Sequence, residues 1–129
     1  MSTSVKELVA RAKSQIRNLS VAEFASEIDN GDVKLIDVRE PDEVGRDGAI
    51  PGAIQAPRGM LEFWADPASP YHRAEFDPSA RTLLYCASSG RSALAVQTLQ
   101  ALGYIDVAHL DGGLKAWKEQ GRPVTSQTA

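Results

Sequence analysis

The chain has 129 residues, of which 43% are hydrophobic and 24% charged, and its net charge at pH 7 is −3. A chain of this length suits one domain that needs no disulfide or structural metal to form a core. The negative charge argues against nucleic acid or an anionic membrane as a partner, although a local basic pocket remains compatible with it. The single cysteine, Cys86, excludes an internal disulfide and a cysteine-based zinc site, and it fits a reducing compartment.

The first segment predicts a helix. Apolar residues recur at helical spacing from Val5 to Ile16, and Ser4 and Glu7 are placed to form a capping box. We expect residues 1–18 to form a helical extension that packs either on the domain or on a second copy of the chain. No segment approaches the ~20 apolar residues of a membrane span, and the N-terminus lacks the apolar core of a signal peptide, so we expect a cytoplasmic protein with no membrane partner.

Helices and strands are expected to alternate after this extension. A second helix follows Ser20, where Glu23 completes another capping box, and it ends at Gly31. The remaining expected elements are a buried strand at 33–38, a short helix from Pro41, a brief strand at Ile54, a helical turn at 60–64, a buried strand at 82–85, a helix at 91–102, a strand at 106–110 and a helix through Leu114 and Trp117. This alternation predicts an α/β domain over residues 19–125, with an open, mostly parallel sheet flanked by helices on both faces. Residues 126–129 are expected to be a disordered tail.

Cys86 follows the strand at 82–85, and ligands of parallel α/β sheets bind at the carboxyl ends of strands. The residues after it are small, polar or cationic: Ala87, Ser88, Ser89, Gly90, Arg91 and Ser92. Small residues let backbone N–H groups converge, and the following helix adds free N–H groups and the positive end of its dipole. A cysteine at the end of an apolar strand is more often a buried hydrophobic residue, but this polar context favours a thiolate at neutral pH.

Four segments, in order along the chain, resemble the signatures of the rhodanese homology family. They are Leu35–Pro41, Gly48–Ile54, the loop from Cys86 to Arg91, and a C-terminal run that contains Leu110–Leu114, Ala116-Trp117 and Gly121–Val124. The resemblance covers nearly everything from Leu19 to Val124. It implies a single-domain sulfurtransferase that works by a ping-pong reaction and needs no metal or organic cofactor. A donor gives its outer sulfur to the cysteine, and a nucleophilic acceptor removes it from the resulting persulfide.

We therefore expect Cys86 to be the catalytic nucleophile. The backbone N–H groups from Ala87 to Ser92 are expected to bind the anion, and Arg91 to orient the loop or the donor. Arg58 lies in the irregular stretch after the brief strand, where it is a candidate second cation near the sulfur; the alternative is that it has no specific role.

The charged and polar residues considered outside the loop favour structural roles. Asp37 and Arg39 leave a strand near the expected site, where a local salt bridge can support the loop from behind. Nothing in the spacing places His72 or His109 near Cys86, and a histidine in the middle of a strand is more often a satisfied structural residue. We do not expect a cysteine–histidine dyad.

Two positions depart from the family pattern. Ala49 stands where the second signature usually has a histidine, so any role of that histidine is absent. Ser89 stands where the loop usually has a glycine. If this position needs a positive φ, serine is strained there; the alternative is that its hydroxyl points at the sulfur.

Loop length favours sulfur over phosphorus. Four residues separate Cys86 from Arg91, as in rhodaneses, whereas the related cell-cycle phosphatases have a longer loop with a wider bowl. An arsenate reductase or phosphatase is the less favoured enzyme alternative. A different class of alternative is a binding module, in which the fold is retained as a sulfide sensor or docking partner with negligible turnover.

The expected partners are a small sulfur donor and a thiol or cyanide acceptor. Thiosulfate and a persulfide, including a protein persulfide, are the candidate donors. The loop has one arginine and no lysine, which does not support a strong preference for thiosulfate. The oligomeric state stays open.

Overall fold

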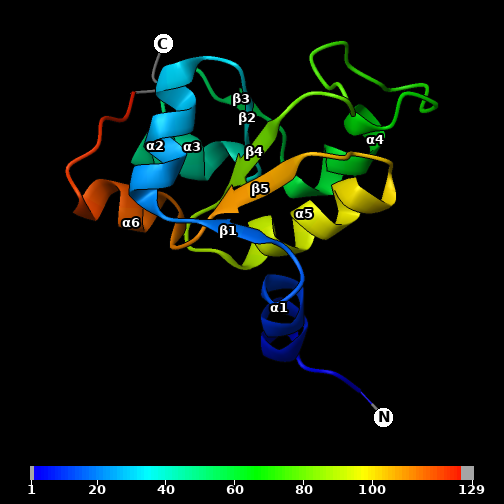
Figure 1. The fold of residues 1–129 in the computed structure, drawn as a ribbon, viewed down its shortest axis with the longest axis horizontal. Helices are drawn as coiled ribbons and strands as arrows, with labels where there is room; N and C mark the ends of the chain where they lie inside the picture. Colours follow the sequence, from blue (N-terminus) through cyan, green and yellow to red (C-terminus); the bar gives the residue numbers. More distant parts are fainter. Residues whose placement is uncertain (1, 126–129) are drawn as a thin grey trace.

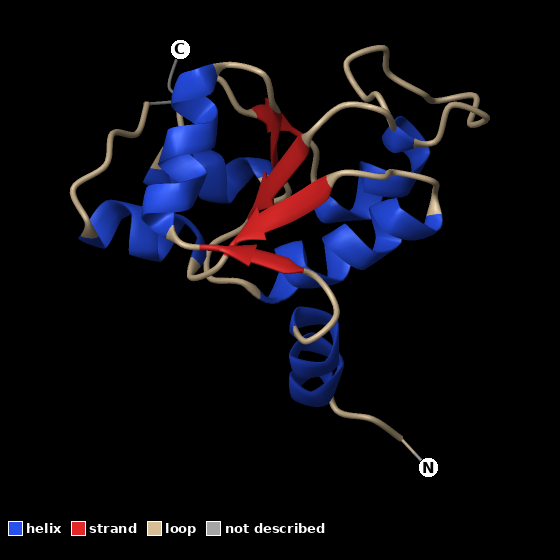
Figure 2. Cartoon of the chain, viewed as in Figure 1, coloured by secondary structure: helices blue, strands red, loops and turns tan. Residues whose placement is uncertain are grey.

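Five parallel strands form the centre of the molecule, with helices on both sides (Figures 1 and 2). In this computed structural model, which describes residues 2–125, the strand order is β1-β5-β4-β2-β3. The strands are β1 (Arg17–Leu19), β2 (Lys34–Asp37), β3 (Ile54–Gln55), β4 (Thr82–Tyr85) and β5 (Val107–Leu110). Every neighbouring pair is parallel, which confirms the expected open α/β sheet. The expected tail, residues 126–129, lies outside the described residues.

The helices form a layer on each face of the sheet. They are α1 (Val5–Lys13), α2 (Val21–Asn30), α3 (Pro41–Asp47), the 3-10 helix η1 (Arg58–Met60), α4 (Leu61–Ala65), α5 (Gly90–Ala101) and α6 (Gly113–Glu119). Figure 1 shows α2, α3 and α6 on one side of the sheet and α4 and α5 on the other. Within residues 2–125, no helix is both long enough and apolar enough to cross a membrane.

Local sequence signals set several helix ends as predicted. The capping boxes of Ser4 with Glu7 and of Ser20 with Glu23 are both formed. Each box satisfies backbone N–H groups that the first helical turn leaves without partners. Gly31 ends α2 with a φ of 83°, a conformation that glycine adopts without steric cost.

The two sides of the sheet carry separate hydrophobic clusters because successive strand side chains point to opposite faces. In β2 and β4, Ile36 and Leu84 pack toward α4 and α5. Leu35 and Leu83 pack on the other side, in the cluster that contains residues of α2 and α6. The buried strands thus hold their carboxyl ends, including the residue that follows β4, between two packed layers.

The strand β1 was not predicted. Residues 17 and 18, which we placed in a helical extension, pair with β5 as Arg17↔Ala108 and Asn18↔His109. The helix α1 ends earlier, at Lys13, and packs against α5. The extension is therefore joined to the domain through a sheet edge and a helix contact. A three-residue strand is too short to show an alternating pattern, so the sequence carries no clear signal for it.

Candidate active site

Cys86 lies at the carboxyl edge of the sheet, directly after β4, and its side chain is 1% exposed. The Ser92 backbone N–H donates to Cys86 Sγ at 3.4 Å, and the Cys86 thiol donates to Ser92 Oγ at 3.5 Å. The loop therefore turns the sulfur back over the first turn of α5. Among the described residues, the backbone N–H groups of residues 87–91 have no hydrogen-bond partner and are free to donate to an anion.

The start of α6 holds the loop from behind. The Leu114 N–H donates to the Cys86 carbonyl at 2.9 Å, and the Lys115 N–H donates to the Ala87 carbonyl at 3.1 Å. Gly113 has a φ of +61°, and a Cβ there would lie 2.6 Å from the Cys86 carbonyl oxygen. Only a glycine lets α6 approach the loop this closely, so Gly113 of the C-terminal signature serves the geometry of Cys86.

Ser89 does not have the positive φ that would strain a serine. Its φ is −161°, which is extended backbone. Its hydroxyl does not contact the sulfur; it donates to Asp111 Oδ1 at 3.3 Å and accepts from the Gly112 N–H at 3.2 Å. Lys13 of α1 donates to the same hydroxyl at 3.3 Å and pairs with Asp111 at 2.7 Å. The serine thus ties the loop to both α1 and α6.

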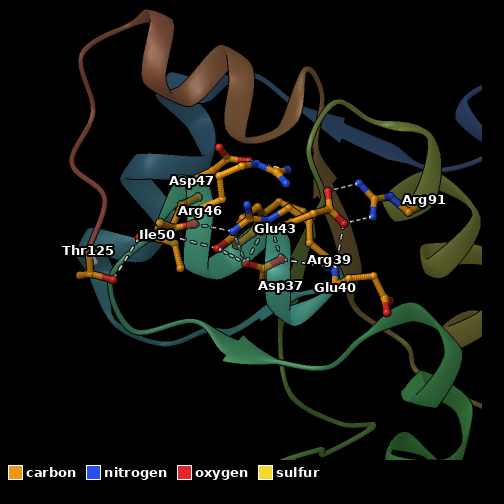
Figure 3. A network of polar contacts seen from close by, with 12 residues as sticks. Asp37, Arg39, Glu40, Glu43, Arg46, Asp47, Ile50, Arg91 and Thr125 are labelled. Carbon is orange, nitrogen blue, oxygen red and sulfur yellow. Dashed lines mark hydrogen bonds and ion pairs between the residues drawn. The ribbon is translucent and has the colours of Figure 1, made fainter. Parts of the chain in front are cut away.

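Arg91 is held by an acidic residue of α3. Its guanidinium donates to both carboxylate oxygens of Glu43, at 2.6 and 2.9 Å, as Figure 3 shows. The hydrogen bonds from Arg91 lower the pKa of Glu43 to about 2, helped by the Glu40 N–H. A bidentate pair of this kind fixes the arginine plane. The contact therefore suits Arg91 to orienting the loop.

Glu43→Gln should remove the part of the pH dependence of folding stability that comes from this ion pair. The pKa of Glu43 in the folded protein lies below its ordinary value of 4.5. Its contribution to stability is therefore complete above about pH 4.5 and is lost as the pH falls toward 2. In urea unfolding, wild type should exceed Glu43→Gln in stability at neutral pH, with a difference that shrinks through this range. A difference that stays constant in acid would contradict the pairing.

Behind the loop lies a buried polar network. Asp37 and Arg39 pair at 2.7 Å with side chains 0% and 1% exposed. Tyr85, the residue before Cys86, donates its hydroxyl to Asp37 at 2.8 Å and accepts from the Ile50 N–H at 3.0 Å. Burial raises the pKa of Tyr85, so its hydroxyl stays a donor. Figure 3 shows Asp37, Arg39 and Ile50 of this network beside α3. The hydrogen bond from Tyr85 to Asp37 connects the end of β4 to the end of β2.

Arg58, the candidate second cation, lies away from the Cys86 loop. Arg58 pairs with Glu62 at 2.8 Å and donates to Thr98 at 2.9 Å. Thr98 is eight residues after the start of α5, or about 12 Å along the helix axis. The structure therefore does not bring the guanidinium of Arg58 to the Cys86 loop. Ala49, in place of the usual histidine, is buried and forms an isolated antiparallel bridge with Thr125.

The two histidines have different surroundings. His72 Nε2 lies 3.2 Å from the Phe76 carbonyl, within the irregular stretch. His109 Nδ1 lies 2.8 Å from Ser92 Oγ, so His109 reaches Cys86 through one hydroxyl group. The spacing in the sequence did not indicate this indirect link between His109 and Cys86. Its signal was the strand alternation, because Ala108 and Leu110 face the other cluster and His109 must face α5.

A cavity of about 220 Å³ lies beside the loop. Its lining consists of Arg39, Asp47, Ala87, Leu114, Lys115 and Lys118. The loop itself lacks lysine, but α6 brings two lysines to its edge. Positive charge is therefore available to an anionic donor from a helix that is distant from Cys86 in the sequence.

Comparison with known proteins gives consistent matches. Residues 20–120 match the family model of the rhodanese-like domain. An uncharacterized protein of Synechocystis sp. is 42% identical over 92 residues, which cover 70% of this chain and 46% of that relative, so the chain spans about half of the relative's length.

Two solved structures share most of the fold. A protein of unknown function from Rhodopseudomonas palustris, described as a possible tyrosine phosphatase, is 40% identical with a TM-score of 0.91, over 97% of this chain and 96% of that one. The polysulfide-sulfur transferase homodimer of Wolinella succinogenes is 29% identical with a TM-score of 0.76, over 95% of this chain and 88% of that one.

Proposed function

The chain belongs to the rhodanese-like domain family, and from this premise we propose that it is a sulfurtransferase that carries sulfur on Cys86. The observation that carries the proposal is the sulfur at the carboxyl end of β4. It is followed by five backbone N–H groups, at residues 87–91, that have no hydrogen-bond partner within residues 2–125. Such a bowl stabilises a negatively charged sulfur, whether a thiolate or the outer atom of a persulfide. The named relative from Wolinella, a polysulfide-sulfur transferase, supports the same class of reaction.

The proposed reaction has two displacements. The Cys86 thiolate attacks the outer sulfur of thiosulfate or of a persulfide donor, the new S–S bond forms, and sulfite or a thiolate leaves. A cyanide or thiol acceptor then attacks the outer sulfur of the Cys86 persulfide, and the S–S bond of that persulfide breaks. The outer sulfur leaves on the acceptor, as thiocyanate or as a new persulfide, and Cys86 is released as the thiolate. No electrons are gained or lost overall, because sulfane sulfur only changes its partner. We place the donor in the cavity beside Ala87, with Lys115 and Lys118 near its charge.

Phosphoryl chemistry is the competing enzyme function, since the Rhodopseudomonas protein is described as a possible tyrosine phosphatase. Phosphate is tetrahedral and needs a wider ring of donors than a single sulfur atom. The loop here has four residues between Cys86 and Arg91, and Arg91 is bound to Glu43. Both features favour sulfur transfer. The binding-module alternative predicts that the protein binds a sulfur species without turnover. A cytoplasmic location of the protein stays a prediction.

Turnover separates these functions. Purified wild type should convert thiosulfate or a persulfide, with cyanide as acceptor, to thiocyanate in steady state, and Cys86→Ser should lose this activity because a hydroxyl is not a sulfur nucleophile at neutral pH. Neither protein should release phosphate from an aryl phosphate or consume arsenate. Cys86-dependent phosphate release without thiocyanate would overturn the proposal in favour of a phosphatase.

A further inference from the structure

A buried chain of polar contacts links Cys86 to the first strand. Cys86 Sγ lies 3.5 Å from Ser92 Oγ, Ser92 Oγ lies 2.8 Å from His109 Nδ1, and His109 Nε2 lies 2.7 Å from Asn18 Oδ1. Cys86, Ser92 and His109 are at most 1% exposed. The four residues come from the end of β4, from α5, from β5 and from β1. Because β1 pairs with β5 as Asn18↔His109, the sheet itself places the amide beside the imidazole.

The partners of Asn18 fix the direction of these hydrogen bonds. Its Nδ2 donates to the carbonyls of Lys13 and Ile16, at 2.9 and 3.3 Å, so its Oδ1 faces His109. An amide oxygen only accepts, and His109 Nε2 must therefore carry the proton. The pKa of His109 is lowered to about 4, chiefly by burial and to a smaller extent by Lys13, while Asp111 opposes this shift. The imidazole is neutral at physiological pH, and its Nδ1 is an acceptor.

The hydroxyl of Ser92 has one proton to give. His109 Nδ1 takes it at 2.8 Å, while the Ser89 carbonyl lies farther away at 3.3 Å. Ser92 Oγ then faces Cys86 with a lone pair, which accepts from the thiol but cannot donate to a thiolate. To serve a thiolate the hydroxyl must turn away from His109 and leave Nδ1 buried without a donor, which is unfavourable.

We propose that His109, oriented by Asn18, is a positioning residue that withholds the Ser92 hydroxyl from the Cys86 thiolate and so favours the protonated or sulfur-loaded cysteine. In a persulfide the charge lies on the outer sulfur, so Sγ has no need of this hydroxyl. The part of this proposal that concerns the sulfur-loaded form, the Cys86 persulfide, rests on the proposed function of Cys86 as a sulfur carrier. Arg91, the cation of the loop, is already bound to Glu43 at 2.6 Å.

The pH profile of Cys86 alkylation tests this arrangement. Cys86 is the only cysteine, so iodoacetamide reports on it alone. His109→Leu frees the Ser92 hydroxyl, and the midpoint of the profile should fall by about one pH unit, which is about a tenfold gain in thiolate at a given pH. In a Ser92→Ala background, the same His109→Leu change should have no effect on the midpoint.

The alkylation midpoint of Ser92→Ala alone tests the proposal independently of how well His109→Leu folds. Because the hydroxyl in wild type accepts from the thiol and does not donate to the thiolate, its removal should leave the midpoint at or below the wild-type value. A rise of about one unit would overturn the proposal, since the hydroxyl would then already stabilise the thiolate. A higher midpoint in His109→Leu would also overturn it and make His109 a base for the thiol. The assay uses no sulfur donor, so its outcome is separate from that of the turnover test.

Discussion

Asp37→Ala should lower the free energy of unfolding by about 3–5 kcal/mol, because it removes one partner of a buried ion pair. The Arg39 guanidinium, 1% exposed, would keep its charge without a carboxylate. The Tyr85 hydroxyl and the Arg39 backbone N–H would lose the same acceptor. Within residues 2–125, the contacts left to the Arg39 guanidinium would be the Gly48 carbonyl at 2.6 Å and the face of the Tyr85 ring, and neither is an anion. Urea unfolding of wild type and variant measures the difference.

A surface pair of the same type is the matched control. Arg46 and Asp47 form an ion pair at 3.2 Å, with side chains 64% and 40% exposed. Asp47→Ala should change stability by no more than about 1 kcal/mol, since water screens the charge that remains. Similar losses in Asp37→Ala and Asp47→Ala would show that the buried network does not support the end of β4.

Gly113→Ala should reduce sulfur transfer by about a hundredfold, because a displacement of the nucleophile by about 1 Å is enough for such a loss. The added Cβ would lie 2.6 Å from the Cys86 carbonyl oxygen and 2.7 Å from the Ala87 carbonyl carbon. Both atoms belong to backbone that cannot turn aside as a flexible side chain does. The loop must therefore move as a unit, and the sulfur moves with it. The steady-state rate of thiocyanate formation measures this loss.

Gly121→Ala separates the clash from backbone strain. Gly121 has a φ of +72°, similar to that of Gly113, but a Cβ there would have no neighbour within 4 Å. Its replacement should cost about 1–2 kcal/mol of stability from the left-handed conformation alone and leave the transfer rate unchanged. Equal losses of activity in the two variants would contradict a specific role for Gly113 in placing Cys86.

The predictable part of the structure is the part with local or periodic signals. The capping residues Ser4 and Ser20 and the terminal Gly31 set helix ends through contacts within a few residues. The apolar runs of β2 and β4 indicated buried parallel strands, and the polar loop after β4 indicated an anion site. Cys86 could be chosen as the candidate nucleophile because small and polar residues follow it directly.

The unpredicted part depends on distances between segments. The pairing of Asn18 with His109, and of His109 with Ser92, follows from the strand order and register, which short strands do not reveal in sequence. The hydroxyl of Ser89 turns to Asp111 because α6 starts beside it. Arg58 was a candidate by its position in an irregular stretch, and its ion pair with Glu62 holds it elsewhere.

The most direct test of the account is the intact mass of the protein after incubation with thiosulfate or a small-molecule persulfide, followed by cyanide. Wild type should gain the mass of one sulfur atom and lose it to cyanide as thiocyanate, while Cys86→Ser should gain nothing, because Cys86 is the only thiol in the chain. A wild-type mass that does not change with either donor, or the same gain in Cys86→Ser, would contradict a persulfide on Cys86.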